Sequence, residues 1–257
     1  MVCTLDKNRV STIRKALKAL GKKNFVFIMH NGSFPAAEGE NTGFGTINSN
    51  GGKNFLNYAQ GLFDAIQMGP AGKTKSSDSS PYTGTIFSNN PLFIDLKELT
   101  TDKWFKILSE KTFHDIVENN PNKDKNRTSY TYITKRQDEA LTEAFNNFEK
   151  LNNKELNKEF EAYKKENDSW LSKDSLYEAL SIKNGTDFWP NWKDKTDKNL
   201  FNPKTKEEEK AFAKRIEEAS KTYAKEIEKY KFIQFALNKQ NLETKKLADS
   251  KGIKMIA

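Results

Sequence analysis

Glycine is distributed very unevenly along the chain, because the first hundred residues hold 11 of the 13 glycines. Glycine favours turns and tight loops and weakens helices from within. The first hundred residues alternate short apolar runs with turns rich in Gly, Ser and Pro, whereas residues 135–250 have almost no glycine. This asymmetry predicts an α/β front part followed by a mainly helical part, with far more helix than strand overall.

The front part has the pattern of a βαβ unit. Phe25–Met29 is a run of five apolar residues, which is typical of a strand buried on both faces of a parallel sheet. Apolar residues then follow at helical spacing between Phe55 and Phe63, and a second apolar run, Ala65–Met68, stops at Gly69. Strand, loop, helix and strand in this order predict a right-handed crossover between parallel strands.

Helical patterns account for most of the remaining chain. The predicted helices are Lys7–Leu20, Lys135–Lys150, Lys154–Asn167, Lys173–Ile182 and one long helix that begins near Thr205. Thr205 and Glu208 have the spacing of a capping box. Gly252 is expected to end the long helix, and 253–257 are expected to form a third strand. A sheet that ends on an apolar strand leaves an open edge. The strand is then either the edge of a complete sheet or part of the front of a larger fold, and the second interpretation is favoured.

Charge and composition exclude several classes of protein. The formal net charge is +8, but residues 204–251 interleave 13 basic with 9 acidic side chains, which is typical of a solvated helix face. We therefore expect no nucleic-acid partner. No window approaches the roughly 20 apolar residues of a membrane span, so no membrane partner is expected. The start of the chain lacks the pattern of a secretory signal, which predicts a soluble, cytoplasmic protein.

Motifs for metals and cofactors are missing from the sequence. One cysteine, Cys3, and two histidines are too few for a zinc cluster or an internal disulfide. Gly43-Phe44-Gly45 lacks the third glycine of a dinucleotide loop, so a turn is the better interpretation. No cofactor is predicted.

Candidate binding residues lie where the two predicted strands end. The polar loop Pro70–Asn90 leaves the carboxyl end of the second strand, where α/β proteins commonly bind their ligands. His30 ends the first strand at the same edge, although for it and for His114 a structural hydrogen-bonding role is favoured over a catalytic one. The carboxylates of the front half (Glu38, Glu40, Asp64, Asp78 and Asp95) show no spacing that requires a catalytic pair.

Several short motifs occur in a fixed order. They are His30-Asn31-Gly32-Ser33-Phe34-Pro35, Gly43-Phe44-Gly45, Gln67-Met68-Gly69-Pro70, Ser80-Pro81-Tyr82, Asn90-Pro91-Leu92-Phe93-Ile94-Asp95-Leu96, Trp170-Leu171 with 176–180, and 232–235 with Gln240, Ala248 and Gly252-Ile253. Together they resemble the amino-terminal half of the 4-alpha-glucanotransferases, the amylomaltase or disproportionating-enzyme family (glycoside hydrolase family 77). The likeness runs from about residue 24 to the end.

The resemblance implies a fold and a domain organisation. It implies an α/β fold that is part of a TIM-type (β/α)8 barrel, with about three barrel strands and a large helical insertion between the second and the third. Residues 1–118 would hold the first strands and the substrate loops, 119–204 the helical insertion, and 205–257 a long helix leading into the third strand.

The resemblance also implies a function. The substrate would be an α-1,4-glucan or maltooligosaccharide, with Tyr82, Ser80 and His30 binding it. The family's nucleophile Asp, acid/base Glu and stabilising Asp would lie beyond Ala257, so no catalytic residue is assigned and this chain alone is expected to be inactive. The family's G-I-G-D-L-G is here reduced to Gly43-Phe44-Gly45 followed by Thr46-Ile47-Asn48.

Two other functions remain open at this point. The chain could be a non-catalytic glucan-binding or scaffold remnant that needs a second polypeptide, either the missing carboxy-terminal half or another copy of itself. A basic helical protein that binds nucleic acid is disfavoured by the interleaved acidic residues and the absence of an aromatic and basic patch.

Overall fold

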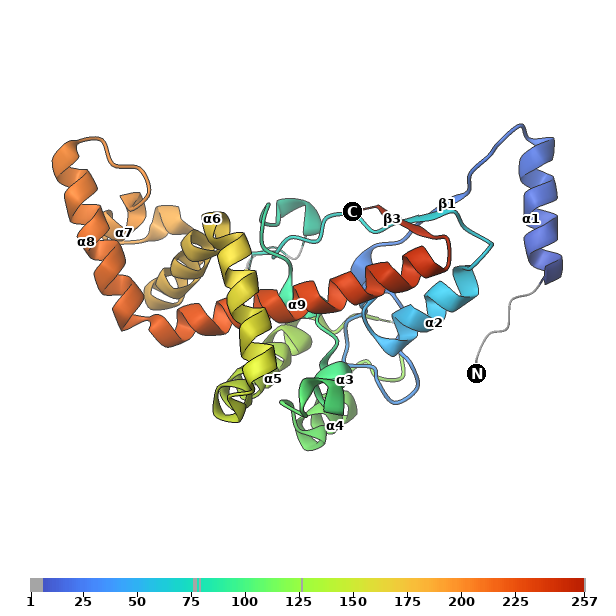
Figure 1. Ribbon diagram of the computed structural model, residues 1–257, viewed down its shortest axis with the longest axis horizontal. Helices are drawn as coiled ribbons and strands as arrows, with labels where there is room; N and C mark the ends of the chain where they lie inside the picture. The colour runs from blue at the N-terminus through green and yellow to red at the C-terminus, as the bar shows by residue number, and fades with distance from the viewer. Residues whose placement is uncertain (1–6, 76–77, 79, 126, 257) are drawn as a thin grey trace. The chain divides into compact units, whose positions relative to one another are not determined.

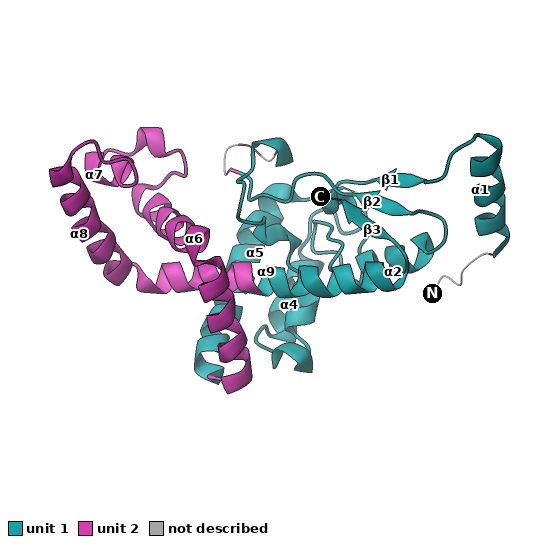
Figure 2. Ribbon diagram, turned by 45° about the horizontal axis from the view of Figure 1, so that its top comes forward, with its two compact units in different colours: residues 1–74, 79–151, 236–257 teal, residues 75–78, 152–235 magenta. Residues whose placement is uncertain are grey.

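The computed structural model describes residues 7–75, 78, 80–125 and 127–256, so Cys3 and Ala257 lie outside the described residues. The chain divides into two compact units (Figure 2). Unit 1 comprises residues 1–74, 79–151 and 236–257, and unit 2 comprises residues 75–78 and 152–235. The boundaries expected after residues 118 and 204 follow changes in sequence texture and stay a prediction.

Unit 1 contains the three strands and most of the short helices (Figure 1). Its elements are α1 (Lys7–Ala19), β1 (Val26–Ile28), η1 (Asn31–Ser33), α2 (Asn50–Ala59), β2 (Ala65–Gln67), η2 (Pro81–Thr83), η3 (Pro91–Phe93), α3 (Leu96–Leu99), η4 (Asp102–Trp104), α4 (Glu110–Glu118), α5 (Tyr130–Leu151), the second part of α9 (Ala224–Ser250) and β3 (Lys254–Ile256). The η elements are 3-10 turns.

The three strands form one parallel sheet in the order β1-β2-β3. Val26 pairs with Ala65 in the first ladder, and Ile66 pairs with Met255 in the second. The parallel pairing predicted for the front part is therefore confirmed, and the third strand, Lys254–Ile256, lies within the predicted range 253–257, whose last residue is outside the described residues. Each strand is three residues long, so the sheet depends on what packs against it.

One face of the sheet is covered by helices. Figure 2 shows α2 and the end of α9 beneath the strands, and their side chains form an apolar cluster with the strand residue Ile66. The buried members of this cluster are Phe34, Ile47, Leu56, Ala59, Ile66, Ala248 and Ile253. Phe27 extends it, since its ring lies 5.5 Å from Phe55 and 4.9 Å from Phe63.

The opposite face of the sheet is open, which corrects the expectation of a strand buried on both faces. Val26 is 41% exposed, Ile28 is 72% exposed and Ile256 is 41% exposed. The apolar run correctly indicates a strand with two apolar faces. Val26, Ile28 and Ile256 are nevertheless left exposed, because α2 and the end of α9 pack on the other face. Ala65 of the central strand, which pairs with Val26, is buried at 4% exposure.

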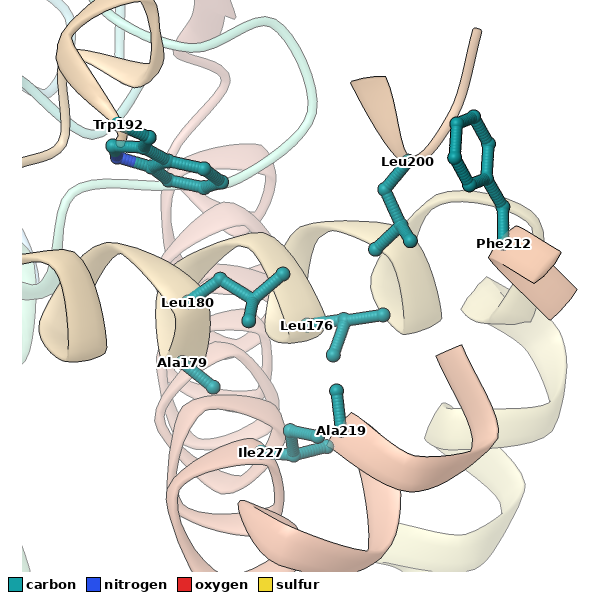
Figure 3. Packing of buried hydrophobic residues seen from close by; sticks show 8 residues of the cluster. All are labelled: Leu176, Ala179, Leu180, Trp192, Leu200, Phe212, Ala219 and Ile227. Atoms are coloured by element: carbon teal, nitrogen blue, oxygen red, sulfur yellow. The ribbon is translucent and has the colours of Figure 1, made fainter. Parts of the chain in front are cut away.

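Unit 2 is helical and consists of α6 (Lys154–Asn184), η5 (Trp189–Asn191), α7 (Lys195–Asn199), α8 (Lys206–Thr222) and the first part of α9. Its core brings together Leu176, Ala179, Leu180, Trp192, Leu200, Phe212, Ala219 and Ile227 (Figure 3). The two helices predicted between Lys154 and Ile182 are in fact one. No Gly or Pro separates them, and Gly185 ends the helix with a φ of +68°.

The single long helix predicted from Thr205 is two helices. The chain leaves helical geometry at Tyr223 (φ −109°, ψ 28°), between α8 and α9. Ala219 before the break and Ile227 after it belong to the same apolar cluster. The apolar spacing continues across the break, so periodicity alone does not reveal it. Within the described residues, no helix has the length and hydropathy needed to cross a bilayer.

Candidate functional site

A pocket of about 330 Å³ opens beside the carboxyl ends of β1 and β2, in unit 1. It is lined by His30, Gly32, Ser33, Phe44, Pro70, Gly72, Thr74, Pro81, Asn90, Phe93, Thr128 and Tyr130. Parallel strands end at the same edge of a sheet, so the segments after β1 and β2 meet here. This is the edge at which the sequence predicts a ligand.

His30 lines the pocket and has one unsatisfied ring nitrogen. It precedes η1, and its Nδ1 accepts a hydrogen bond from the backbone N–H of Gly32 at 3.2 Å. A neutral imidazole that accepts at Nδ1 carries its proton on Nε2. Burial lowers the pKa of His30, so the neutral form is favoured at pH 7. Nε2 is buried without a hydrogen-bond partner among the described residues, which leaves a donor unused.

Aromatic rings form the apolar part of the wall. The ring of Phe44 lies 5.7 Å from that of Phe93 and 6.3 Å from that of Tyr130. Gly45 permits this arrangement, because a Cβ there would lie 2.2 Å from the carbonyl oxygen of Phe34. The Gly43-Phe44-Gly45 segment is therefore a tightly packed turn, as the sequence predicts, and it places an aromatic ring in the wall.

The polar part of the wall is a short chain of hydrogen bonds. The hydroxyls of Thr74 and Tyr130 lie 2.8 Å apart, and Asn90 Nδ2 donates to the same threonine oxygen at 3.4 Å. Tyr130 begins α5, whereas Thr74 and Asn90 belong to the loop after β2. The pocket thus combines apolar rings with hydroxyl and amide groups, a composition typical of sites for small neutral polar ligands.

A second hollow of about 380 Å³ shares Gly32, Ser33, Phe44 and Thr128 with the first. Its remaining lining includes Asn41, Lys125 and Arg127. The shared residues make the two hollows neighbouring parts of one concave region.

Buried amides and hydroxyls hold the loop that follows the turn. Thr46 Oγ1 and Asn48 Nδ2 both donate to the carbonyl oxygen of Phe93, at 2.8 Å and 3.0 Å. Asn48 Nδ2 also donates to Asn241 at 2.8 Å, and its Oδ1 accepts from Thr244 Oγ1 at 2.7 Å. The residues that depart from the family's G-I-G-D-L-G pattern therefore connect the pocket wall to α9.

The segment Asn90–Asp95 is a turn held at both ends. Asn90 Oδ1 accepts from the N–H of Leu92, and Asp95 Oδ1 accepts from the N–H of Lys97. The Gln240 side chain pairs with the backbone of Asp95, accepting from its N–H at 2.8 Å and donating to its C=O at 3.1 Å. This clamp fixes the side of the pocket that carries Asn90 and Phe93.

Asp95 itself is a buried acid behind the pocket. Burial raises the pKa of Asp95 to about 7, with Lys53 opposing the rise and the carboxylates of Glu98 and Glu40 adding to it. Glu98, one turn on, behaves differently. Burial alone would raise its pKa, but hydrogen bonds from Trp104, Lys103 and Lys53 lower it overall.

Residues 31–257 match the model of the 4-alpha-glucanotransferase family, glycoside hydrolase family 77. The chain belongs to this family. A curated 4-alpha-glucanotransferase from Clostridium butyricum is 29% identical over 195 residues, which are 74% of this chain and 34% of the relative. The chain thus spans about a third of that relative's length.

A solved structure shares the fold. An amylomaltase from Streptococcus agalactiae in complex with acarbose matches with a TM-score of 0.73 and 21% identity, over 91% of this chain and 42% of the amylomaltase. The helix-rich α/β arrangement, with its small parallel sheet, is therefore part of an amylomaltase-like fold.

The glucanotransferase motif Ser80-Pro81-Tyr82 lies next to the pocket, but only Pro81 lines it. Tyr82 is 81% exposed, and Ser80 precedes η2 without a side-chain capping bond. Of the three substrate-binding residues predicted from the sequence, the structure thus brings His30 into the wall and leaves Tyr82 and Ser80 outside it. Their role in binding stays a prediction.

Sequence reasoning missed the residues that shape the site from a distance. Tyr130 and Thr74 carry no family motif, and Gln137 Nε2 supports the turn by donating to the carbonyls of Pro91 and Ile94, at 3.1 Å each. A polar residue on the apolar stripe of a helix, such as Gln137 in α5 or Gln240 in α9, is the available signal, since a buried amide needs partners.

Acidic groups are not part of the described pocket wall, because neither Asp nor Glu occurs among its lining residues. Asp95 follows the lining residue Phe93 by two positions and Glu40 precedes the lining residue Phe44 by four, and Glu40 Oε1 accepts a hydrogen bond from Asn50 Nδ2 at 2.8 Å. The described ranges also hold no group of three or more His, Cys, Asp or Glu side chains arranged for a metal ion.

Proposed function

We propose that this chain supplies the glucan-binding part of a 4-alpha-glucanotransferase that transfers α-1,4-glucan segments between maltodextrins. The observation that carries the proposal is the pocket at the ends of β1 and β2, which pairs aromatic rings with neutral hydrogen-bonding groups. Glucose units present apolar C–H faces and hydroxyl rims, so they complement both kinds of wall. Membership of the family supports the same substrate class.

His30 is the residue we assign to hydroxyl recognition inside the pocket. Its Nε2–H has no acceptor among the described residues, and an unsatisfied buried donor is unfavourable by about 1–3 kcal/mol. A sugar oxygen would supply the missing acceptor. Tyr82 and Ser80 are proposed to contact the glucan where it leaves the pocket, since Pro81 between them forms part of the wall.

The transfer itself requires groups that the described pocket does not offer. Retaining glycosyl transfer uses a carboxylate nucleophile and a carboxylic acid about 5–5.5 Å apart, and an acceptor hydroxyl then releases the glucosyl group. The pocket wall includes neither Asp nor Glu among its described lining residues. We propose that the catalytic carboxylates belong to sequence outside residues 1–257, so that this chain alone is inactive.

The open face of the sheet supports a larger barrel. In a (β/α)8 barrel, helices cover the outside of the strands and the strands' other faces form the interior. Here α2 and α9 cover one face, while Val26 and Ile28 on the other are exposed. We propose that β1, β2 and β3 are neighbouring strands of such a barrel.

Binding is tested by titration calorimetry of the whole chain with maltoheptaose. His30→Asn should weaken binding at least fivefold, because the shorter side chain keeps an acceptor for the N–H of Gly32 but does not reach the position of the Nε2–H donor. His114→Asn is the matched control, since the side chain of His114 is 65% exposed and lies outside the pocket wall. The double change Ser80→Ala and Tyr82→Ala tests the motif residues. Unchanged affinity in the His30 variant would contradict the assignment.

Activity is tested with maltotriose. The isolated chain should release no glucose, and a carboxy-terminal fragment of a related glucanotransferase added in trans should restore turnover. Glucose release by the isolated chain that is abolished by Glu38→Gln, Glu40→Gln, Asp78→Asn or Asp95→Asn would show that the carboxylates are present after all.

A non-catalytic glucan-binding or scaffold remnant is the second candidate. The exposed apolar residues of β1 and β3 favour it, because an open apolar face calls for a partner. Light scattering after gel filtration distinguishes self-association from a monomer. Binding of maltoheptaose without turnover, even with the added fragment, would favour this second candidate.

A further inference from the structure

The positive charge of this protein is concentrated in one short segment. Residues 7–23 carry seven Lys and Arg side chains and neither Asp nor Glu. Of the formal net charge of +8, this segment contributes +7, which leaves +1 for the other 240 residues. The basic character of the chain therefore belongs to α1 and the turn after it.

The same segment has an apolar stripe. Val10, Ile13, Leu17 and Leu20 are separated by three, four and three residues, which places them on one helix face. None of the residues of α1 is buried: Val10, Ile13 and Leu17 are half-buried, and Leu20 just after the helix is 72% exposed. The helix is therefore amphipathic and cationic, and the described part of the chain covers its apolar stripe only in part.

One arginine connects α1 to the rest of unit 1. Arg14 Nη1 donates to both carboxylate oxygens of Asp64 at 2.9 Å, and its Nη2 donates to the carbonyl of Gly61 at 2.9 Å. The exposed lysines are not engaged in this way. No ion pair with a described residue is found for Lys7, Lys15, Lys18, Lys22 and Lys23.

We propose that α1 binds anionic lipid bilayers by lying in the plane of the interface. An apolar stripe flanked by lysines is the pattern of interfacial helices, whose apolar face enters the headgroup boundary while the ammonium groups meet the lipid phosphates. This mode needs no membrane-spanning helix. A nucleic acid would use the lysines but leave the apolar stripe in water, so the lipid surface fits both features.

This inference is independent of the glucan proposal. The family match begins at residue 31, after α1, and no residue of α1 lines the pocket. Membrane binding would hold the glucan site of unit 1 close to an anionic surface without altering the site itself.

The test is co-sedimentation of the whole chain with lipid vesicles. One set contains phosphatidylcholine with about 30% phosphatidylserine, and the other contains phosphatidylcholine alone. Binding should be at least about tenfold tighter to the first set, since each basic residue near such a surface contributes roughly fivefold. It should be lost near 1 M salt, where the Debye length falls to about 3 Å.

Matched variants separate local from overall charge. The triple change Lys15→Glu, Lys18→Glu and Lys22→Glu should weaken binding at least about tenfold. The control is the triple change Lys206→Glu, Lys210→Glu and Lys225→Glu, which alters the net charge by the same amount at exposed helical positions of unit 2. This control should change vesicle binding less than about twofold. Leu20→Ser, at a 72% exposed position, should weaken binding several-fold and keep the salt dependence. Titration with maltoheptaose should be the same for all of them.

Three results would overturn the proposal. The first is equal affinity for the two vesicle types, and the second is an equal loss in both triple variants. The third is binding of duplex DNA that matches vesicle binding in strength and is insensitive to Leu20→Ser, which would assign α1 to nucleic acid.

Discussion

Units 1 and 2 each have an apolar cluster, but they differ in the polar bonds that join distant segments. In unit 1, side-chain amides and hydroxyls join segments far apart in sequence, as when Gln240 pairs with Asp95 and Thr244 with Asn48. In unit 2, an apolar cluster joins neighbouring helices, and Leu176 and Trp192 are among its members (Figure 3). The ligand-binding pocket is in the unit whose loops are fixed by polar bonds. Helix packing alone would not hold such loops in place.

The pH dependence of stability should distinguish the two units most strongly. Burial raises the pKa of Asp95 to about 7, whereas an Asp side chain in the unfolded chain has a pKa of about 4. Between these values the unfolded state loses a proton that the folded state keeps, so stability falls as pH rises. The total loss is at most about 4 kcal/mol. In unit 2, Lys183 and Arg215 outweigh burial and lower the pKa of Asp197, so its stabilising effect is lost only as pH falls below 4.

Hydrogen exchange at pH 5 and pH 7.5, resolved by peptide, checks this contrast. Peptides around Asp95 should lose protection at the higher pH, and those of α6 and α8 should not. Asp95→Asn keeps the capping oxygen and should abolish the difference. A difference that persists in this variant would mean that another group titrates.

Removal of core volume should weaken unit 2 by about 3 kcal/mol. Leu176 is 3% exposed within the apolar cluster, and Leu→Ala changes in such cores typically cost about 2–5 kcal/mol. Leu176→Ala should therefore reduce the protection of α6 and α8 in hydrogen exchange. Maltoheptaose affinity is the internal control and should stay the same, because the pocket belongs to unit 1.

Removal of the Gln240 clamp should weaken unit 1 by about 2 kcal/mol and also impair binding. Gln240→Leu keeps most of the volume but leaves the N–H and C=O of Asp95 without their partner, and unsatisfied buried groups cost about 1–3 kcal/mol each. Urea unfolding and maltoheptaose titration measure the two effects. Loss of stability with unchanged affinity would show that the turn does not shape the pocket.

The smallest effect is expected at the start of α8. Thr205 Oγ1 accepts from the N–H of Glu208 at 3.1 Å, and Glu208 in turn accepts from the N–H of Lys204 at 2.6 Å. Thr205→Ala should cost about 1 kcal/mol, measured by urea unfolding, while Thr205→Ser should be nearly neutral. An equal loss in both variants would point to packing of the threonine methyl group.

Local patterns in the sequence predict local structure well in this chain. The βαβ order, the strand that follows Gly252 and the Thr205 cap are all present, because they depend on neighbouring residues. The break at Tyr223 could not be predicted, since the apolar stripe continues through it. The clamp between Asp95 and Gln240 spans 145 residues, and no periodicity links positions so far apart.

The candidate site shows the same division. His30 could be predicted because it ends a strand, and strand ends of α/β proteins gather at one edge. Tyr130 and Thr74 could not, since they meet only after the loop beyond β2 folds against the start of α5. The exposure of Ile28 could not be predicted either, because an apolar run indicates which faces of a strand are apolar and not whether another segment covers them.

The clamp on Asp95 also sets an order of events during protein synthesis. The turn at Asn90 leaves the ribosome long before Gln240, which follows Asp95 by 145 residues. At about 5–20 residues per second, the nascent turn waits roughly 7–30 s for its partner. The strands β1 and β2 can pair in that interval, but this side of the pocket cannot be fixed until most of α9 has been translated.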